Sequence, residues 1–370
     1  MLDAAKNVGV PKPYLGNRAV QWGRIDVSAG GIVPLTRSDL TRYRLRENDL
    51  LVCEGGEVGR AAIWRSQLPE CYFQKALHRL RPRSSYDARV MQALLQYWSS
   101  TGAFSDYVTQ TSIAHLPREK FVLMPMPLPS VAEQRRIGDA LEHGDDLIVG
   151  LERLIAKKQA IKQGMMQQLL TGRTRLPGFD GPWSETNIGS VATVTMGQSP
   201  VGATYNSDGR GLPLIQGNAD IRGRATFDRI WTSAPTKVCE ASDVLLTVRA
   251  PVGYTAVATK RSCLGRGVCA IRAEGDNRFL FHALVYAEPA WKLYEQGSTF
   301  TAVNSAEVRS FVIRWPSDAV ERTSIAAALD DADQELGTLT KRLSKARTLK
   351  TGMMQQLLTG RTRLPVEVSS

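Results

Sequence analysis

Apolar residues recur at alternating spacings of four and three in two long segments of the chain. With Gly144 and Ala332 at the remaining positions, the two series are Ile137, Leu141, Ile148, Leu151 and Ile155, and Ile325, Leu329, Leu336, Leu339 and Leu343. This is the seam of a heptad repeat, so each segment predicts a long helix that packs one narrow stripe against a partner helix. No proline interrupts residues 131–170 or 319–358, and about 40 residues give a rod on the order of 60 Å. We expect an intramolecular antiparallel coiled coil; surface helices of two separate domains are the alternative.

An internal repeat supports the pairing of the two helices. The string GMMQQLLTGRTRLP stands at residues 164–177 and again, identical in all fourteen positions, at residues 352–365, an offset of 188. Glu133 and Glu321 fall in the first turns of the predicted helices, where the helix dipole favours acidic residues. The Thr-Gly pair inside each copy of the string supplies the helix stop.

The segments that precede the helices are related more faintly. Residues 49–63 (DLLVCEGGEVGRAAI) align with residues 243–257 (DVLLTVRAPVGYTAV), and each predicts a strand, a tight turn and a second strand. Each half is therefore a mixed α/β domain followed by a long helix, which makes the predicted fold class mixed α+β with a pseudo-two-fold repeat. The predicted boundaries are 1–130 and 178–316 for the globular domains, 131–177 and 317–365 for the helical regions, and 366–370 for a tail.

One part of the second half has no counterpart in the first. Residues 178–201 contain a predicted strand (SVATVTMG) and a Gly-Gln-Ser-Pro loop, and the alignment places Met1 opposite Gly202. Either the start of the first domain is truncated or mis-assigned, which we favour, or that domain is natively one strand shorter. The second alternative predicts an open sheet edge.

Composition narrows the functional classes. The 370 residues carry 47 Lys and Arg against 36 Asp and Glu, and the net charge of +11 favours a polyanionic partner such as nucleic acid. The excess is concentrated in residues 1–130, with 17 basic and 11 acidic side chains. The five cysteines form no CxxC pair, and no stretch approaches the roughly 18 apolar residues that span a bilayer. We expect a cytoplasmic prokaryotic protein with no disulfide framework, zinc site or membrane partner.

Catalytic motifs are absent from the sequence. It contains no P-loop, no GxGxxG after a strand, no HExxH, no GxSxG and no amino-methyltransferase motif. The four histidines are scattered, and the acidic clusters fall on the predicted helices, where they indicate a solvated face. Neither catalysis nor a resident metal or cofactor is predicted.

Base readout in DNA needs amide and guanidinium groups on loops or helix ends, while Lys, Arg and hydroxyl groups suit phosphates. Candidates on predicted loops of the first domain are Asn17, Arg18, Gln21, Arg24, Arg60 and Lys75. Those of the second are Gln198, Ser199, Gln216, Asn218, Arg222, Arg224, Arg249 and Arg266. Two hydroxyl-rich runs at equivalent places add Thr109, Thr111 and Ser112, and Ser298, Thr299 and Thr301. For each residue alone, an exposed polar side chain without a DNA contact is the alternative.

The whole chain apart from the missing opening of the first domain resembles the specificity subunit of type I restriction-modification systems. The resemblance rests on the duplicated QQLLTGRTRLP, on LPSVAEQRRI before the first helix, and on the PYLGNRAVQWGRID and DLLVCEGGEVGRAAI blocks. It implies two target-recognition domains, each reading one half of a split double-stranded DNA sequence, and an antiparallel coiled coil that fixes the unread spacer. It also implies a subunit without catalysis of its own.

The resemblance further implies two modification (methyltransferase) subunits as partners, and restriction-translocation subunits in the full complex. S-adenosylmethionine, ATP and magnesium would be bound by those partners and not by this chain. Helix residues expected to face the methyltransferases are Asp145, Arg153, Lys157 and Lys158, with Asp333, Lys341, Lys345 and Ala346 as their equivalents. The GMMQQLLTG ends are expected either to join that docking or to form a buried turn. A protein-protein scaffold is the rival function, and a stand-alone nuclease or methyltransferase is a third.

Overall fold

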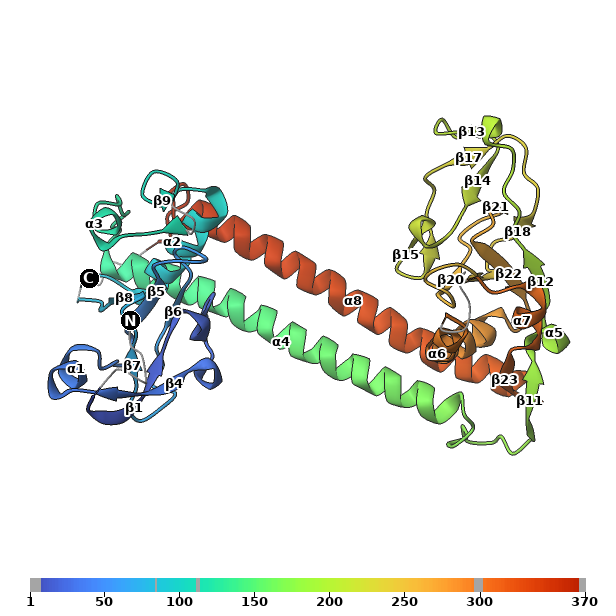
Figure 1. Cartoon of the computed structure of the whole chain (residues 1–370), viewed down its shortest axis with the longest axis horizontal. Coiled ribbons are helices and arrows are strands. Elements are labelled where there is room, and N and C mark those ends of the chain that lie inside the picture. Colours follow the sequence, from blue (N-terminus) through green and yellow to red (C-terminus); the bar gives the residue numbers. More distant parts are fainter. Residues whose placement is uncertain (1–7, 84, 111–113, 296–301, 366–370) are drawn as a thin grey trace. The chain divides into compact units, whose positions relative to one another are not determined.

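The structure is a computed structural model that describes residues 8–83, 85–110, 114–295 and 302–365. The chain divides into two compact units. The first comprises Met1–Arg153 with Lys341–Ser370, and the second comprises Leu154–Thr340. Each unit contains one globular domain and part of both long helices (Figure 1).

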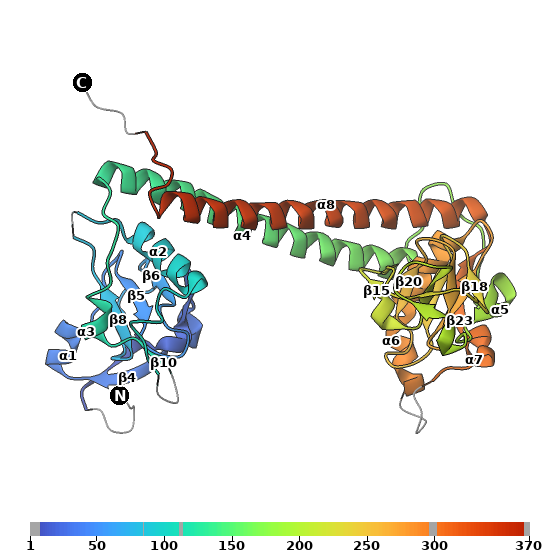
Figure 2. The same ribbon diagram turned by 90° about the horizontal axis from the view of Figure 1, so that it is seen from above.

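The globular domain of the first unit has two three-stranded sheets, ordered β4-β1-β7 and β6-β5-β8, and two short hairpins. Its central strand β5 is buried on both faces: Leu51 and Cys53 contribute to one core, and Leu50 and Val52 to another that includes α2. Helix α2 lies between this sheet and the long helix α4 (Figure 2). The strands are β1 (Val10–Leu15), β2 (Val20–Gln21), β3 (Arg24–Ile25), β4 (Gly31–Leu35), β5 (Leu50–Cys53), β6 (Ala61–Ile63), β7 (Tyr72–Phe73), β8 (Leu77–Leu80), β9 (Thr109–Gln110) and β10 (Ala114–His115). The helices are η1 (Asn17–Ala19), η2 (Val27–Ala29), α1 (Arg37–Arg42), α2 (Ala88–Thr101) and α3 (Arg118–Phe121).

The second globular domain repeats this plan with more strands. A six-stranded sheet has the order β12-β22-β19-β20-β16-β15, a five-stranded sheet the order β13-β17-β14-β21-β18, and β11 pairs with β23. The strands are β11 (Trp183–Asn187), β12 (Thr193–Met196), β13 (Tyr205–Asn206), β14 (Leu212–Ile215), β15 (Ile221–Arg222), β16 (Ala225–Thr226), β17 (Trp231–Thr232), β18 (Val238–Cys239), β19 (Val244–Thr247), β20 (Thr255–Val257), β21 (Ser262–Leu264), β22 (Val268–Arg272) and β23 (Val312–Pro316). The helices are α5 (Ile188–Val191), η3 (Gly202–Thr204), η4 (Asn218–Asp220), α6 (Asn277–Glu295) and α7 (Ser305–Ser310).

The strand-turn-strand prediction is confirmed in both domains, because β5 pairs antiparallel with β6 and β19 pairs antiparallel with β20. The strand predicted from SVATVTMG is β12, which pairs with β22. Two-residue strands also occur where loops were expected: Val20–Gln21 and Arg24–Ile25 form a hairpin around Gly23, whose φ is +68°. Alternation was too short there for the pattern to indicate strands.

The two predicted long helices are α4 (Val131–Leu169) and α8 (Ala319–Leu357). In the first unit, Ile137 and Leu141 near the start of α4 share a core with Met354 and Leu358 near the end of α8. In the second unit, Ile325 and Leu329 near the start of α8 share a core with Leu169 and Leu170 at the end of α4. The helices are therefore antiparallel within each unit, as predicted. All ten seam residues are buried or half-buried.

Oppositely charged side chains join the two long helices beside the seam. In the first unit, Lys350 pairs with Asp145 and Arg347 pairs with Glu152. In the second unit, Lys158 pairs with Glu335 at 2.7 Å and Lys162 pairs with Asp333. These partners belong to the helices themselves, so part of the polar face expected to meet other subunits is used inside the chain.

The duplicated string has a structural role at the start of the opposite helix. After α4 ends, Arg175 donates from Nε and Nη2 to both carboxylate oxygens of the buried Glu321, at 2.6 and 2.7 Å. Arg363 makes the same bidentate contact with the buried Glu133. The two arginines occupy equivalent positions of the repeat, 188 residues apart, and so do the two glutamates. The leucines of the strings are therefore buried at the helix ends, while the part expected for the strings in docking other subunits stays a prediction.

Candidate nucleic-acid interface

Both domains present an equivalent turn that carries a basic side chain. In the first domain the turn between β7 and β8 is held by Gln74, whose backbone N–H donates to the carbonyl of Leu15 at 2.9 Å. In the second domain the turn between β21 and β22 is held by Gly265, whose N–H donates to the carbonyl of Ile215 at 2.8 Å. Exposed Lys75 and Arg266 follow these anchors directly. The described ion pairs include neither side chain.

In the second domain this turn meets two further loops. A Cβ on Gly197 would lie 2.1 Å from the Gly265 carbonyl oxygen, and a Cβ on Gly267 would lie 2.2 Å from the Gln216 carbonyl oxygen. Only glycine permits such a close approach of backbones. The result is one loop edge that unites four sequence-predicted residues, Gln198, Ser199, Gln216 and Arg266.

Hydrogen bonds hold this edge in place and leave its tip free. The backbone N–H and the Nε of Arg266 both donate to the Ser199 hydroxyl at 3.3 Å. Thr236 donates to the carbonyl of Gln198, so the amide side chain of Gln198 is exposed on a fixed backbone. The guanidinium of Arg266 keeps its two Nη groups, the fork that matches guanine or a phosphate.

Arg249 and Asn218 extend the same edge. The N–H of Val248 donates to the Gly267 carbonyl at 2.9 Å, which places exposed Arg249 beside the turn. Asn218 begins the 3-10 turn that follows Gln216 and is exposed. The equivalent of Arg249 in the first domain is Gly55, so the two edges differ in the side chains that they offer.

Two other candidates of the second domain lie on the β15-β16 hairpin and not on this edge. The guanidinium of Arg224 pairs with Glu288 and donates to the Thr255 carbonyl at 3.0 Å, so it is engaged within its own domain. Arg222 is exposed on β15, with its guanidinium 3.9 Å from the ring centre of Phe227. The sequence interpretation of Arg224 as a free loop residue is therefore not supported by its contacts.

In the first domain, two candidates hold loops together. Asn17 donates to the Gly55 carbonyl at 3.2 Å, while Arg60 donates to the Asn17 carbonyl at 2.9 Å and pairs with Glu57 at 3.0 Å. Gln21 donates to the carbonyl of Arg18 at 3.0 Å. Exposed Arg18 and Lys75 are thus the basic candidates of this edge that lack an ion pair among the described residues.

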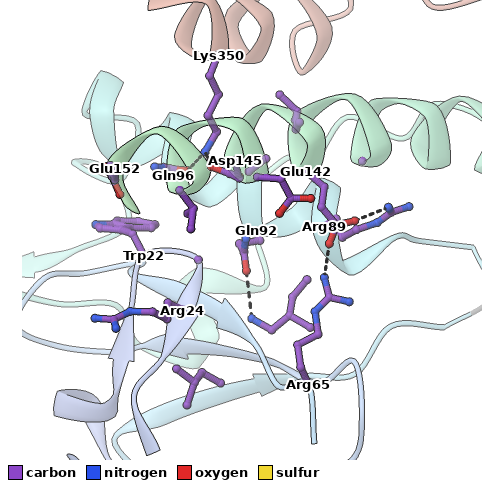
Figure 3. Close-up of a pocket in the computed structure, with 18 of the residues that line it drawn as sticks. Trp22, Arg24, Arg65, Arg89, Gln92, Gln96, Glu142, Asp145, Glu152 and Lys350 are labelled. Atoms are coloured by element: carbon purple, nitrogen blue, oxygen red, sulfur yellow. Dashed lines mark hydrogen bonds and ion pairs between the residues drawn. The ribbon is translucent and has the colours of Figure 1, made fainter. Parts of the chain in front are cut away.

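Arg24 lies elsewhere, at a pocket of about 750 Å³ between the β2-β3 hairpin, α2 and α4 (Figure 3). Arg65 reaches across to Glu142 at 2.7 Å, and Lys350 pairs with Asp145. The cations of the pocket are largely matched by carboxylates. It therefore lacks the positive excess that a phosphate backbone requires.

Described residues beside the two hydroxyl-rich runs contact the same edges. Thr109 lies on β9, opposite His115, and an isolated bridge joins His115 to Gly55. In the second domain the equivalent bridge joins Arg249 to Ala302. The predicted residues Thr111, Ser112, Ser298, Thr299 and Thr301 lie outside the described residues.

The described residues also offer little for catalysis. All five cysteines are buried free thiols, and burial raises the pKa of the Cys269 thiol to about 12, which keeps it protonated. Burial lowers the pKa of His282, whose Nε2 lies 2.8 Å from Asp330 in a contact between α6 and α8. Within the described ranges we find no group of three or more His, Cys, Asp or Glu that could hold a metal, and no helix able to cross a membrane.

Sequence reasoning missed the framework that assembles the loop edge. Gly197 was expected only as part of a DNA-facing Gly-Gln-Ser-Pro loop, and Gly265 and Gly267 had no assigned role, although the Gly-Arg-Gly triplet around Arg266 was a signal available in the sequence. The meeting of loops that are 50 to 70 positions apart depends on strand order, which spacing along the chain does not reveal.

Comparisons with known proteins show what the chain is similar to. The family model described as the type I restriction modification DNA specificity domain matches residues 21–163 and 181–346. A putative type I restriction enzyme MjaX specificity subunit from Methanocaldococcus jannaschii is 27% identical over 373 residues, covering 95% of this chain and 87% of the relative. Among solved structures, the HsdS subunit from Thermoanaerobacter tengcongensis is 27% identical with a TM-score of 0.52, covering 97% and 93% of the two chains. A chain from a study of complex assembly and conformational transition of the type I R-M system is 26% identical with a TM-score of 0.61, covering 96% and 93%.

Proposed function

Because the chain belongs to the family of type I restriction modification DNA specificity proteins, we propose that it selects the DNA sequence on which such a complex acts. It is a non-catalytic specificity subunit. The observation that carries the proposal is the pair of equivalent loop edges built on the same backbone hydrogen bonds but bearing different side chains. Such edges suit two half-sites of different sequence.

Each domain reads one half of a bipartite duplex through its own edge. Arg266, Gln216 and Gln198 supply the guanidinium and amide groups that recognise guanine and adenine in the major groove. Lys75 and Arg18 supply the corresponding cations of the first domain. The wider positive excess of that domain contributes contacts to phosphates, which add affinity without sequence information.

Modification subunits with methyltransferase activity are the proposed protein partners, two per chain, with restriction-translocation subunits added for cleavage. The surface offered to them includes the exposed helix residues Arg153, Lys157, Lys341 and Lys345. Ala346 does not belong to this surface, because it is buried, with 8% of it exposed. S-adenosylmethionine, ATP and magnesium are assigned to those partners, and the length of α4 and α8 is proposed to set the unread spacer.

The chain provides a direct test once it is co-purified with the methyltransferase subunit. We expect the complex to bind one split duplex with an affinity that falls steeply as salt increases. Arg266→Ala should relax the preference at one position of one half-site, while Arg222→Ala, which removes another exposed arginine away from the loop edge, should leave it unchanged. Binding without a salt slope or sequence preference would favour the scaffold function instead.

The predicted domain boundaries and the cytoplasmic location remain part of this proposal. Proteolysis of the complex would test the boundaries, since loops between compact elements are cut first. Lengthening both long helices by one heptad should change the spacer of the recognised sequence and leave the half-sites as they are. An unchanged spacer would remove the role proposed for helix length.

A further inference from the structure

Arg229 lies beside the loop edge of the second domain, although it is not among the sequence-predicted residues. The backbone N–H of Leu214 donates to the carbonyl of Ile230 at 2.8 Å, which continues the antiparallel pairing of β14 with β17. Arg229 therefore reaches the end of β14, where Gln216 begins the loop. Its side chain is 45% exposed.

One buried carboxylate joins Arg229 to the loop edge. The side chain of Asp220 is 1% exposed. Its Oδ2 accepts the backbone N–H of Gln216 at 2.8 Å, and its Oδ1 accepts Nε of Arg229 at 2.8 Å. Because charge-assisted hydrogen bonds are strong and directional, this carboxylate holds the guanidinium in one orientation relative to the loop.

The two Nη groups of Arg229 remain available to a ligand. Within the described part of the chain, the hydrogen bond and ion pair of Arg229 are made through Nε. Arg266 is held in the same way, with its Nε on the Ser199 hydroxyl. By contrast, Arg272 meets the buried Asp243 with both Nε and Nη2, which uses its fork inside the domain.

The equivalent position of the first domain has no arginine. The hairpins β2-β3 and β15-β16 have the same register, 201 positions apart. At this offset Arg229 corresponds to Ser28, whose hydroxyl donates to Asp26 at 2.6 Å. Asp220 corresponds to Ala19, which is buried and carries no carboxylate. The two loop edges therefore differ in chemistry at this point.

The pairing with Asp220 favours a base over a phosphate as the target of Arg229. The carboxylate offsets much of the positive charge that attracts a phosphate, but it leaves the directions of the two Nη donors fixed. Guanine presents two neutral acceptors, O6 and N7, in the major groove, and a fixed fork matches both at once.

We propose that Arg229 reads a guanine in the half-site of the second domain and that Asp220 is its positioning residue. The assignment rests on the proposed function of the chain in DNA recognition. Since the first domain offers no guanidinium at the equivalent position, the effect is confined to one half-site.

Selection of bound duplexes from a randomised pool tests the assignment, with the full chain co-purified with its methyltransferase subunit. Arg229→Lys keeps a cation opposite Asp220, so the domain should fold, but it removes the fork. We expect discrimination at one guanine of one half-site to fall by roughly 5- to 100-fold, with every other position unchanged.

The matched control for this substitution is Arg210→Lys. Arg210 pairs with Asp208 through Nε at 2.9 Å, just before the start of β14 and so at the opposite end of that strand from the loop edge. The control should leave the whole motif unchanged. A control effect equal to that of Arg229→Lys would overturn the assignment.

Asp220→Asn tests the positioning role. It should relax the same guanine in the otherwise wild-type chain and add little in the Arg229→Lys background, because residues that act as a unit are not additive. An equal further relaxation in the double variant would overturn the positioning role.

Three other results would overturn the proposal. The first is an unchanged motif in Arg229→Lys, which a phosphate contact would give because lysine also binds phosphate. The second is an equal loss of preference at every position of that half-site, which indicates that Arg229 only supports the loop. The third is the absence of any split motif with the wild-type complex. That result would overturn the proposed function as well, whereas the first two leave it standing.

Discussion

The clasp between Glu133 and Arg363 offers the sharpest test of how the duplicated string stabilises the fold. Glu133 lies in the first turn of α4 and is 2% exposed. Its carboxylate accepts hydrogen bonds from Nε and Nη2 of Arg363. Glu133→Gln keeps the shape of the side chain but removes its charge and turns one acceptor into a donor. That donor then faces a guanidinium, which has no acceptor.

The expected cost follows from these contacts. A hydrogen bond to a charged group contributes about 1.5–3 kcal/mol, and a neutral one about 1 kcal/mol. One bond is lost and the other keeps only the guanidinium as a charged partner, but water replaces part of the loss because the Arg363 side chain is 68% exposed. We expect Glu133→Gln to lower the free energy of unfolding by about 2 kcal/mol, which for a unit of this size lowers Tm by roughly 4–8 °C.

Thermal melts followed by circular dichroism measure this difference, with Glu152→Gln as control. Glu152 pairs with Arg347 but its side chain is 45% exposed, so its loss should cost about 0.5 kcal/mol or less. Equal effects of the two substitutions would refute the reasoning.

The same pair predicts a pH dependence. The Arg363 guanidinium holds the pKa of Glu133 below its ordinary value of 4.5. A carboxyl whose pKa is lowered on folding stabilises the protein above its unfolded pKa, and this contribution is lost as pH falls through the folded pKa. The Tm gap between the wild type and Glu133→Gln should therefore be full at neutral pH and narrow below about pH 4.5. A gap that stays constant into acid would contradict the assigned cause.

Four further substitutions have expected outcomes. Leu329→Ala removes a seam side chain that is 0% exposed and should cost about 2–5 kcal/mol, read from the urea midpoint. Gly59→Ala places a Cβ 2.4 Å from the Phe104 ring at a φ of +80° and should cost about 2–4 kcal/mol, read from a thermal melt; a neutral effect would show that the ring can move aside. Arg266→Ala should leave Tm within about 1 °C of wild type but change DNA preference, whereas Arg224→Ala should lower Tm because Glu288 loses its partner. If Arg266→Ala lowered Tm and Arg224→Ala changed DNA preference instead, Arg266 would be the structural residue and Arg224 the DNA-binding one.

The long helices could be predicted from the sequence because a heptad seam is a local signal repeated many times. The alternation of Ile137, Leu141 and Leu151 determines which face is buried, whatever the remaining fold. The strand-turn-strand motifs were equally local. Helix ends were predicted to within a residue, since proline and glycine stand beside them.

The polar contacts could not be predicted, because their partners are far apart in the chain. Arg224 meets Glu288 across 64 positions, and Arg175 meets Glu321 across 146. Spacing along the sequence says which side chains are polar, but not which of them are engaged by a distant carboxylate. Equivalent positions of the repeat also differ in burial. Ala346 is buried, whereas Lys158, its equivalent in the first half, is half-exposed.

Sequencing of modified bases in the genome of the host tests the central claim most directly. A strain that expresses the chain with its methyltransferase subunit should methylate one bipartite motif, with two specified halves separated by a fixed unread spacer. Arg266→Ala in the same strain should alter one half of that motif and leave the other unchanged. Methylation of the same motif after deletion of this chain would contradict the account, as would a motif without two separate halves.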